Sequence, residues 1–159
     1  MFEPGAPIDE VERDVESIIM ALVHELGERA DADPEPLGAE ERAYIAAFSD
    51  ARANTDRNQA GLLSTAIRQP NLAESLVYLN QRLDRQDLDP REPVGILGII
   101  VRLAMDGLWV SDILDSTRFK PADRRRITDV LTGMTYLTDA RLKELLAELQ
   151  PKAAGDKKG

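Results

Sequence analysis

Apolar residues recur at spacings of three and four along most of the chain, and breaks rich in proline and glycine separate the segments that carry them. This period is typical of amphipathic α-helices that turn one face toward a core. We expect Asp9 to cap the first helix, which carries Val11, Val15 and Leu26 on its apolar side. The stretch from Ala30 to Ala39 has no such period and predicts a surface loop. The pattern predicts an all-α domain of six or seven helices.

The next three predicted helices are short. The second carries Tyr44 and Phe48, and we expect Thr55 to cap a third, whose apolar side includes Leu62. The dipeptide Gln69-Pro70 ends the third helix, because the residue before a proline avoids the helical conformation. We expect the fourth helix to begin at Pro70 and to bury a narrow stripe of four leucines: Leu72, Leu76, Leu79 and Leu83.

The fifth helix, from Val94 to Leu114, is apolar in nearly every direction around its axis. A helix of this kind is buried on all sides, either at the centre of its own domain or against a second subunit. Asp89, Pro90 and Glu92 predict a capped start, with Pro93 as the alternative boundary. Its charged residues exclude a membrane span, because each would cost about 2.5 to 3.5 kcal/mol near the bilayer centre: Arg102, Asp106 and Asp112.

Two further helices complete the chain. The sixth begins at Pro121, and the seventh is capped by Thr138 and stopped by Pro151. We expect residues 9–150 to form one helical bundle, flanked by disordered ends at residues 1–8 and 151–159.

Composition and charge restrict the classes of function. The 159 residues are 43% hydrophobic, enough for one core, and contain few aromatic side chains. The formal net charge of −9 repels the phosphate backbone, which predicts no direct binding of nucleic acid. The chain has no cysteine and its N-terminus is acidic where an export signal is basic, so we expect a cytoplasmic protein with no membrane association.

The sequence RLAMDGLWVSDIL at Arg102–Leu114, followed by Phe119–Met134, resembles the C-terminal domain of TetR-family transcriptional regulators. The segment Pro70–Leu83 resembles the helix that lines the inducer pocket of that domain, and Arg42–Phe48 resembles an earlier helix. The resemblance covers roughly residues 9 to 137 in order and pattern. It implies a helical domain that binds a small effector and dimerises.

Complete members of that family begin with a basic helix-turn-helix module that reads DNA, and nothing of this kind precedes Val11. Residues 9–29 hold more acids than bases, so the first helix is no substitute for that module. We therefore expect either a separate sensing and dimerising domain or a truncated regulator. The predicted function is that of a regulator's C-terminal domain that senses a small apolar ligand. The alternative is a helical interaction protein that pairs with another, full-length regulator and binds no ligand.

We expect the effector to lie in an interior pocket reached from the second, fourth and fifth helices, where apolar walls carry a few polar tips. Each of these side chains taken singly is more often a core residue than a ligand contact. The predicted lining consists of Tyr44, Phe48, Leu62, Leu76, Tyr78, Met105 and Trp109.

We expect a homodimer formed mainly by the fifth and sixth helices, because one subunit offers too little cover for a helix that is apolar all round. Arg102 and Asp106 lie one turn apart and are expected to pair, either at this interface or at an exposed edge. The glycines of the fifth helix would permit close approach of the two subunits. The predicted interface residues are Gly98, Arg102, Asp106, Gly107, Ile127, Leu131 and Met134.

No motif in the sequence predicts an enzyme, a cofactor or a metal site. His24, the only histidine, is expected to be a partly exposed structural residue. The acids Asp84, Asp87 and Asp89 lack the spacing of a calcium loop and are expected in a solvated turn. The run Arg124–Arg126 is expected to be surface charge, because adjacent residues of a helix point in different directions.

Overall fold

The computed structural model describes residues 8–59, 68, 74–92 and 94–151, of which residues 8–15, 55, 57–59, 75 and 76 by their backbone alone. This part of the chain contains seven α-helices and no strand, which confirms the predicted all-α fold. The helices are α1 (Ile8–Asp31), α2 (Ala39–Phe48), α3 (Ala51–Gln59), α5 (Glu74–Asp87), α6 (Gly95–Leu114), α7 (Pro121–Met134) and α8 (Asp139–Leu149).

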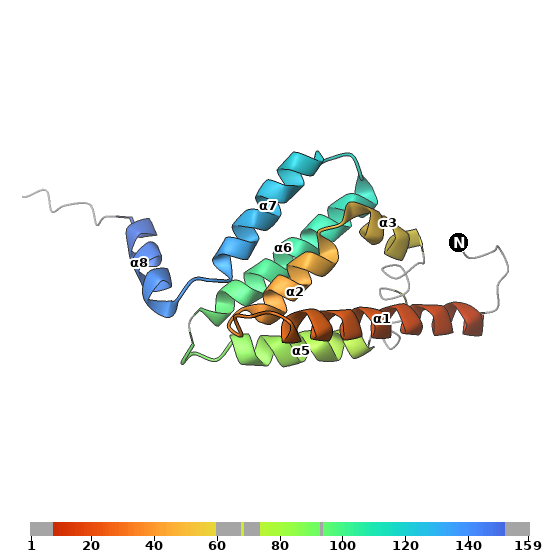
Figure 1. Ribbon diagram of the computed structural model, residues 1–159, viewed down its shortest axis with the longest axis horizontal. Helices are drawn as coiled ribbons and strands as arrows, with labels where there is room; N and C mark the ends of the chain where they lie inside the picture. The colour runs from red at the N-terminus through yellow and green to blue at the C-terminus, as the bar shows by residue number, and fades with distance from the viewer. Residues whose placement is uncertain (1–7, 60–67, 69–73, 93, 152–159) are drawn as a thin grey trace, which may run out of the picture.

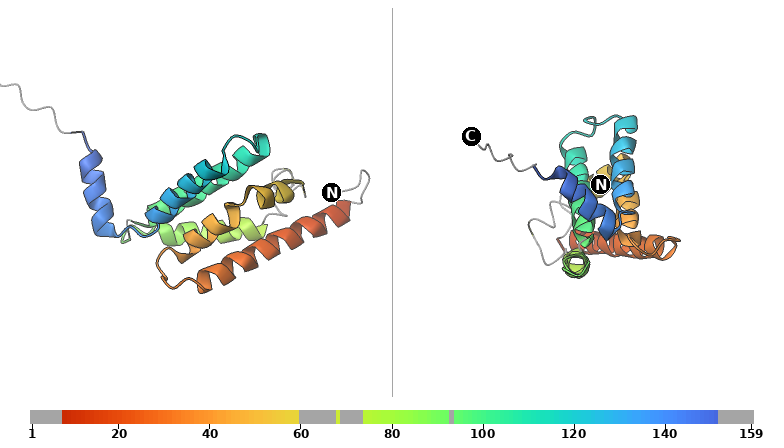
Figure 2. Two further views of the ribbon diagram at one scale, coloured as in Figure 1. Left: turned by 45° about the horizontal axis from the view of Figure 1, so that its top comes forward. Right: turned by 90° about the vertical axis from the view of Figure 1, so that its left-hand side faces the viewer.

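Helices α2 and α6 form the centre of the bundle (Figure 1). Both contact α3 and α7, while α1 packs on α2 and α5 packs on α6. Helices α1 and α5 lie side by side and contact each other, forming a layer that crosses beneath the central pair. Helix α8 lies at the end of the bundle opposite α3 and points away from it (Figures 1 and 2).

Helix α6 supplies much of the core through one of its faces. Val101 and Met105 are completely buried there, and they belong to one cluster with Phe48 of α2 and with leucines of α1 and α5. The opposite face is open to solvent, with Leu103 64% exposed. The helix is therefore central, but it is not buried on all sides within one subunit. No helix in the described ranges is long and apolar enough to span a lipid bilayer.

The structure corrects three of the predicted helix caps. Asp9 lies inside α1, which begins at Ile8, so its predicted role as a cap is wrong. Thr55 lies inside α3, so its predicted role as a cap is wrong; Asp50 Oδ1 instead accepts from the backbone N–H of Arg52 at 2.8 Å. The predicted cap of α6 by the segment around Asp89 is also wrong, because Asp89 binds its neighbour Arg91. The start of α7 at Pro121 and the cap of α8 by Thr138 are confirmed.

A buried arginine attaches the loop between α1 and α2 to the end of α7. Arg42 donates to Asp33 and Glu35 in the loop and to Thr135 Oγ1 at 3.0 Å. Gly38 in this loop has φ +76°, and a Cβ there would lie 2.6 Å from the carbonyl oxygen of Thr135. A loop between Asp31 and Ala39 agrees with the predicted surface loop, and only glycine allows it to approach α7 this closely.

Candidate functional site

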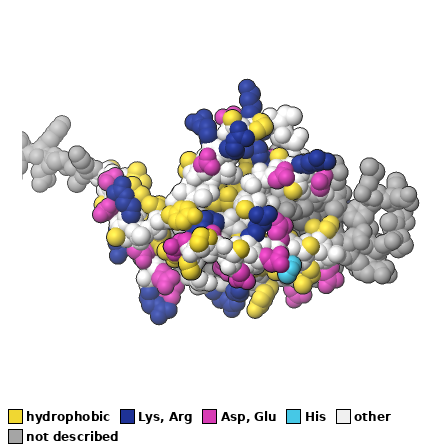
Figure 3. Space-filling model, viewed as in Figure 1, with side chains coloured by type: hydrophobic (Ala, Val, Ile, Leu, Met, Phe, Trp, Pro, Cys, Tyr) yellow, Lys and Arg dark blue, Asp and Glu magenta, His cyan; other side chains and the backbone are white. Residues whose placement is uncertain are grey.

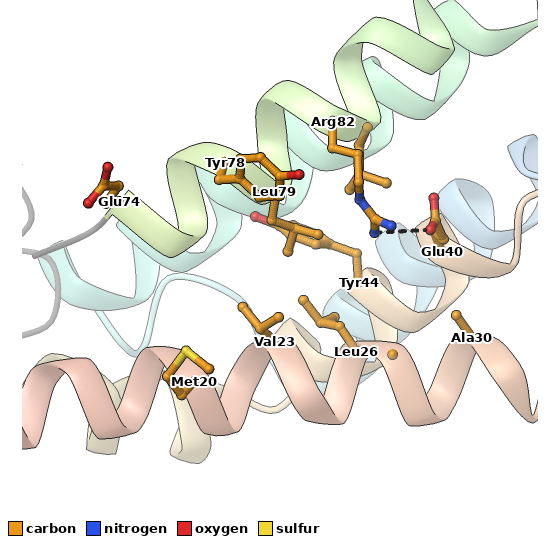
Figure 4. A pocket seen from close by; sticks show the side chains of 12 residues that line it. Met20, Val23, Leu26, Ala30, Glu40, Tyr44, Glu74, Tyr78, Leu79 and Arg82 are labelled. Carbon is orange, nitrogen blue, oxygen red and sulfur yellow. Dashed lines mark hydrogen bonds and ion pairs between the residues drawn. The ribbon is translucent and has the colours of Figure 1, made fainter. Parts of the chain in front are cut away.

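A cavity of about 700 Å³ lies between α1, α2 and α5 (Figure 4). Apolar side chains at helical spacing on α1 form its floor, and α5 forms the facing wall. The lining residues of α1 run from Met20 to Ala30, and a helix rises 1.5 Å per residue, so the cavity is about 15 Å long. The lining residues are Met20, Val23, Leu26, Gly27, Ala30, Glu40, Tyr44, Glu74, Tyr78, Leu79, Arg82 and Leu83.

Tyr44 separates this cavity from the core. Its ring lies 4.6 Å from that of Phe48, and its hydroxyl donates to a carboxylate oxygen of Asp106 on α6. Burial raises the pKa of Tyr44, and the charge of Asp106 raises it further, so the phenol remains neutral. Burial also raises the pKa of Asp106, although the hydrogen bond from Tyr44 opposes this. Tyr44 therefore gives the cavity an aromatic wall and directs its polar atom toward α6.

The charged groups of the cavity lie toward its two ends (Figure 4). Arg82 Nη2 lies 3.4 Å from Glu40 Oε1, which makes an ion pair between α5 and α2 at one end. Glu74 lies at the other end, beyond Tyr78, and has no ion pair with any described residue. The stretch between the two ends is apolar.

The structure brings two of the seven predicted ligand residues to this cavity, Tyr44 and Tyr78. Phe48 and Met105 are core residues, respectively 3% and 0% exposed, and Trp109 packs against Phe48 with ring centroids 5.9 Å apart. Leu62 and the side chain of Leu76 lie outside the described residues.

Helix α1 lines the cavity in the position where α6 was expected. The inner face of α6 is filled by close packing against α2, so α6 contributes no lining residue to the cavity. Residues such as Val23 and Gly27 were missed because their spacing equally fits a helix that only covers the core. Gly27 carried a weak signal, since a glycine inside an otherwise regular helix often has a packing or functional reason.

Arg102 does not pair with Asp106, so that prediction is wrong. Its guanidinium, only 4% exposed, donates to Glu41 of α2 at 3.0 Å and to Asp87 and Asp84 of α5 at 2.6 and 2.7 Å. The prediction of a solvated turn is therefore wrong for Asp84 and Asp87, which lie in α5 and belong to an ion cluster that joins three helices, whereas Asp89 binds Arg91 outside this cluster. Burial raises the pKa of Glu41, and the nearby Asp87 adds to this shift. Three carboxylates therefore share one buried cation.

The predicted interface residues differ in exposure. Gly98 and Leu131 are buried like Arg102, and Gly98 packs so closely that a Cβ would lie 2.7 Å from Asp87 Oδ2. Ile127 and Met134 are partly buried against the core. Gly107 is exposed, with no atom within 4 Å of the position of a Cβ. The exposed apolar face of α6 was not predicted in detail; it carries Ile96, Ile100, Leu103, Val110 and Leu114.

The three consecutive arginines are not all surface charge. Arg124 is 8% exposed, and it binds the buried carboxylate of Asp112 and the carbonyl oxygen of Ser49. Asn54 of α3 donates to the other oxygen of Asp112 at 3.0 Å. The prediction is wrong for Arg124 because this one side chain points toward α6, whereas Arg125 and Arg126 are exposed.

A second cavity, of about 370 Å³, lies where the ends of α1, α5 and α7 meet the starts of α2 and α6. Its lining includes Glu41 and Asp87 and is more polar than that of the first cavity. Across the described ranges, no group of three or more His, Asp or Glu side chains is arranged to hold a metal ion. The larger cavity is thus the better candidate for a small organic ligand.

A family model described as "Tetracyclin repressor-like, C-terminal domain" matches residues 38–136. The chain belongs to this family. The match confirms the resemblance drawn from the sequence, and it runs from the start of α2 to just beyond the end of α7. No curated protein and no solved structure matches the chain. For this Tetracyclin repressor-like domain, the central helices and the α5 wall of the cavity fall within the matched range, whereas α1 and α8 lie outside it.

Proposed function

We propose that this domain is the sensing and dimerising part of a transcriptional regulator, and that the cavity between α1, α2 and α5 binds a small, largely apolar effector. The cavity itself carries this proposal. Its volume of about 700 Å³ falls within the range of ligand pockets, and its apolar walls with a few polar groups are typical of them. Regulation through such a ligand agrees with the family to which the chain belongs.

Gly27 allows a test of ligand binding that leaves the fold intact. A Cβ on Gly27 would meet no atom within 4 Å, so a Phe side chain there has room and is expected to occupy the cavity. Nile red, a neutral apolar dye that fluoresces in apolar sites, is the probe. We expect saturable binding to the unmodified protein and at least about tenfold weaker binding to Gly27→Phe.

The matched control is Gly133→Phe, because Gly133 is a helical glycine of α7 with equally open space and lies outside the cavity. This variant should bind Nile red like the unmodified protein. No saturable binding to any form, or equal binding to Gly27→Phe, would contradict a ligand site in this cavity.

The exposed face of α6 supports a dimer. Ile100, Leu103 and Val110 are 39–64% exposed on this face, and Gly107 lies between the last two. Monomers rarely leave an apolar patch of this kind in water, and a second copy can cover it because a two-fold axis places the same face against itself. Val130, 65% exposed, provides an apolar contact on the neighbouring α7. Gly98 and Arg102 face inward, so the proposed interface centres on Gly107 and Leu103.

Sedimentation equilibrium tests the dimer. Leu103→Glu should shift the protein to a monomer that keeps its helical circular-dichroism signal, because the side chain is 64% exposed within one subunit. Val77→Glu, on α5, is the control: Val77 is also exposed and lies outside the proposed interface. Unmodified protein that sediments as a monomer at micromolar concentration would contradict the dimer.

The alternative function, an interaction protein that pairs with another regulator, uses the same face of α6 but needs no ligand. It predicts a monomer without saturable Nile red binding. The two measurements above therefore distinguish the two functions.

A further inference from the structure

The charged groups that line the cavity differ in whether another described side chain already neutralises them. Among the described residues of the lining, Arg82 alone is basic, and its guanidinium already lies 3.4 Å from Glu40. A ligand carboxylate at that end would displace or repel the Glu40 carboxylate. The part of the lining that the structure describes therefore offers no unneutralised positive charge to an anion.

The other end of the cavity carries an acidic side chain, Glu74. It has no ion pair with a described residue, and it lies one helical turn before Tyr78 on the same side of α5. Tyr78 is 63% exposed, so its ring face is accessible to a ligand. A carboxylate beside an aromatic ring suits an ammonium group, which can bind the carboxylate and contact the ring face.

The distance between the two ends defines the shape of the ligand. The lining of α5 runs from Glu74 to Leu83, about 14 Å along the helix, and the stretch between faces Val23 and Leu26 of α1 (Figure 4). We propose that the effector is an elongated lipophilic cation whose ammonium group binds at Glu74 and Tyr78 and whose apolar body lies along this slot. This inference rests on the proposed function, because it assigns a chemical class to the same cavity. The net charge of −9 also attracts cations toward the protein.

Three probes with the same ten-carbon tail isolate the effect of the head group: decylammonium, decan-1-ol and decanoate, each titrated below its micelle-forming concentration by calorimetry. We expect decylammonium to bind about tenfold more tightly than decan-1-ol, the effect of one ion pair and one cation–π contact near the surface, and decanoate to bind most weakly. Glu74→Gln should abolish the preference for the ammonium group and leave the affinity for decan-1-ol unchanged.

Glu28→Gln is the control, because Glu28 is an exposed acid of α1 outside the cavity lining. It should keep the preference for decylammonium. Equal affinities for the three probes, tighter binding of decanoate, or a preference that survives Glu74→Gln would overturn the lipophilic-cation proposal. In each of these cases, binding of decan-1-ol that Gly27→Phe blocks would still support the cavity as a ligand site. If Nile red binds but none of the three probes does, the inference is wrong and the proposed function stands.

Discussion

Three arginine side chains are buried in the described part of this domain, and each has a different set of acceptors. Arg42 binds one carboxylate, two carbonyl oxygens and a hydroxyl, and Arg124 binds one carboxylate and one carbonyl. Arg102 binds three carboxylates. A buried cation is stable only when its charge is neutralised and its N–H groups are hydrogen-bonded. The three carboxylates around Arg102 do both, and together they carry more negative charge than one guanidinium neutralises.

We expect Glu41→Gln to leave the free energy of unfolding at pH 7 unchanged or higher, because Arg102 retains Asp84 and Asp87 while one surplus charge is removed. Folding raises the pKa of Glu41 above its ordinary value of 4.5. The resulting stabilisation is complete below that value and is lost as the pH rises through the folded pKa. Unmodified protein should thus gain stability from pH 7 to pH 5 in urea unfolding, and the variant should gain less.

Asp33→Asn tests a carboxylate whose pKa is shifted in the direction opposite to that of Glu41. The hydrogen bond from Arg42 holds the pKa of Asp33 below its ordinary value, so the ionised carboxylate stabilises the fold at neutral pH. This variant should be less stable than the unmodified protein at pH 7. If Glu41→Gln were the more damaging of the two, the surplus of charge at Arg102 would be disproved.

Asp112→Ala should lower the free energy of unfolding by about 3 to 5 kcal/mol, because it leaves the guanidinium of Arg124 buried without its carboxylate. Asp123→Ala is the control, since its ion pair with Arg126 is exposed and 3.7 Å long, and such pairs contribute less than about 1 kcal/mol. Both are measured by urea unfolding. Similar losses for the two variants would contradict the expectation that the buried ion pair contributes more to the free energy of unfolding than the exposed one.

The partners of these arginines could not be predicted from spacing. Asp106 lies one turn from Arg102, so the sequence favoured that pair, but the true partners belong to α2 and α5. Residues that are distant in sequence become neighbours only when the helices pack, and periodicity within one helix contains no information about this. Which of three consecutive arginines is buried depends on the same packing.

At the level of helices, the sequence predicted α6 correctly to within one residue, because a long apolar run between prolines and a polar turn leaves little choice. The buried face of α6 was not predictable, since apolar residues surround the axis and no polar side marks the outside. Two residues of the predicted lining, Tyr44 and Tyr78, line the cavity, but the spacing of the apolar residues on α1 indicated only a helix that covers the core.

Gly107→Ala tests the outer face of α6 at the level of the helix. A Cβ has room there, so alanine should stabilise α6 within one subunit by about 0.5 to 1 kcal/mol, but it should weaken the dimer if two copies of Gly107 approach closely. Gly27→Ala, on α1, has equal room and lies outside the proposed interface. It should raise stability without any change in dimer affinity. Identical effects of both substitutions on sedimentation would argue against contact at Gly107.

For the whole molecule, the distribution of charge determines which large partners can bind. One group of basic side chains lies over the start of α7, where Lys120, Arg125 and Arg126 are exposed, and basic and acidic side chains are intermixed over the rest of the face in Figure 3. We expect no binding to duplex DNA in a mobility-shift assay at physiological salt, because the net charge is −9. Binding that appears only at about tenfold lower salt would be non-specific. Sequence-selective retention at physiological salt would contradict the prediction.

The hydrogen bond between Asp139 and Val94 bears on where the C-terminal boundary of a stable domain lies. The family match stops at residue 136, yet Asp139 Oδ1 accepts from the backbone N–H of Val94 at 2.7 Å, and Val94 gives α6 no side-chain cap of its own. A chain cut after Thr138 should lose at least about 1 kcal/mol of stability in thermal unfolding relative to one cut after Gln150, because it lacks the hydrogen bond of Asp139 and the buried Leu142. A stable form of this domain therefore extends beyond the end of the family match and includes Asp139, the first residue of α8.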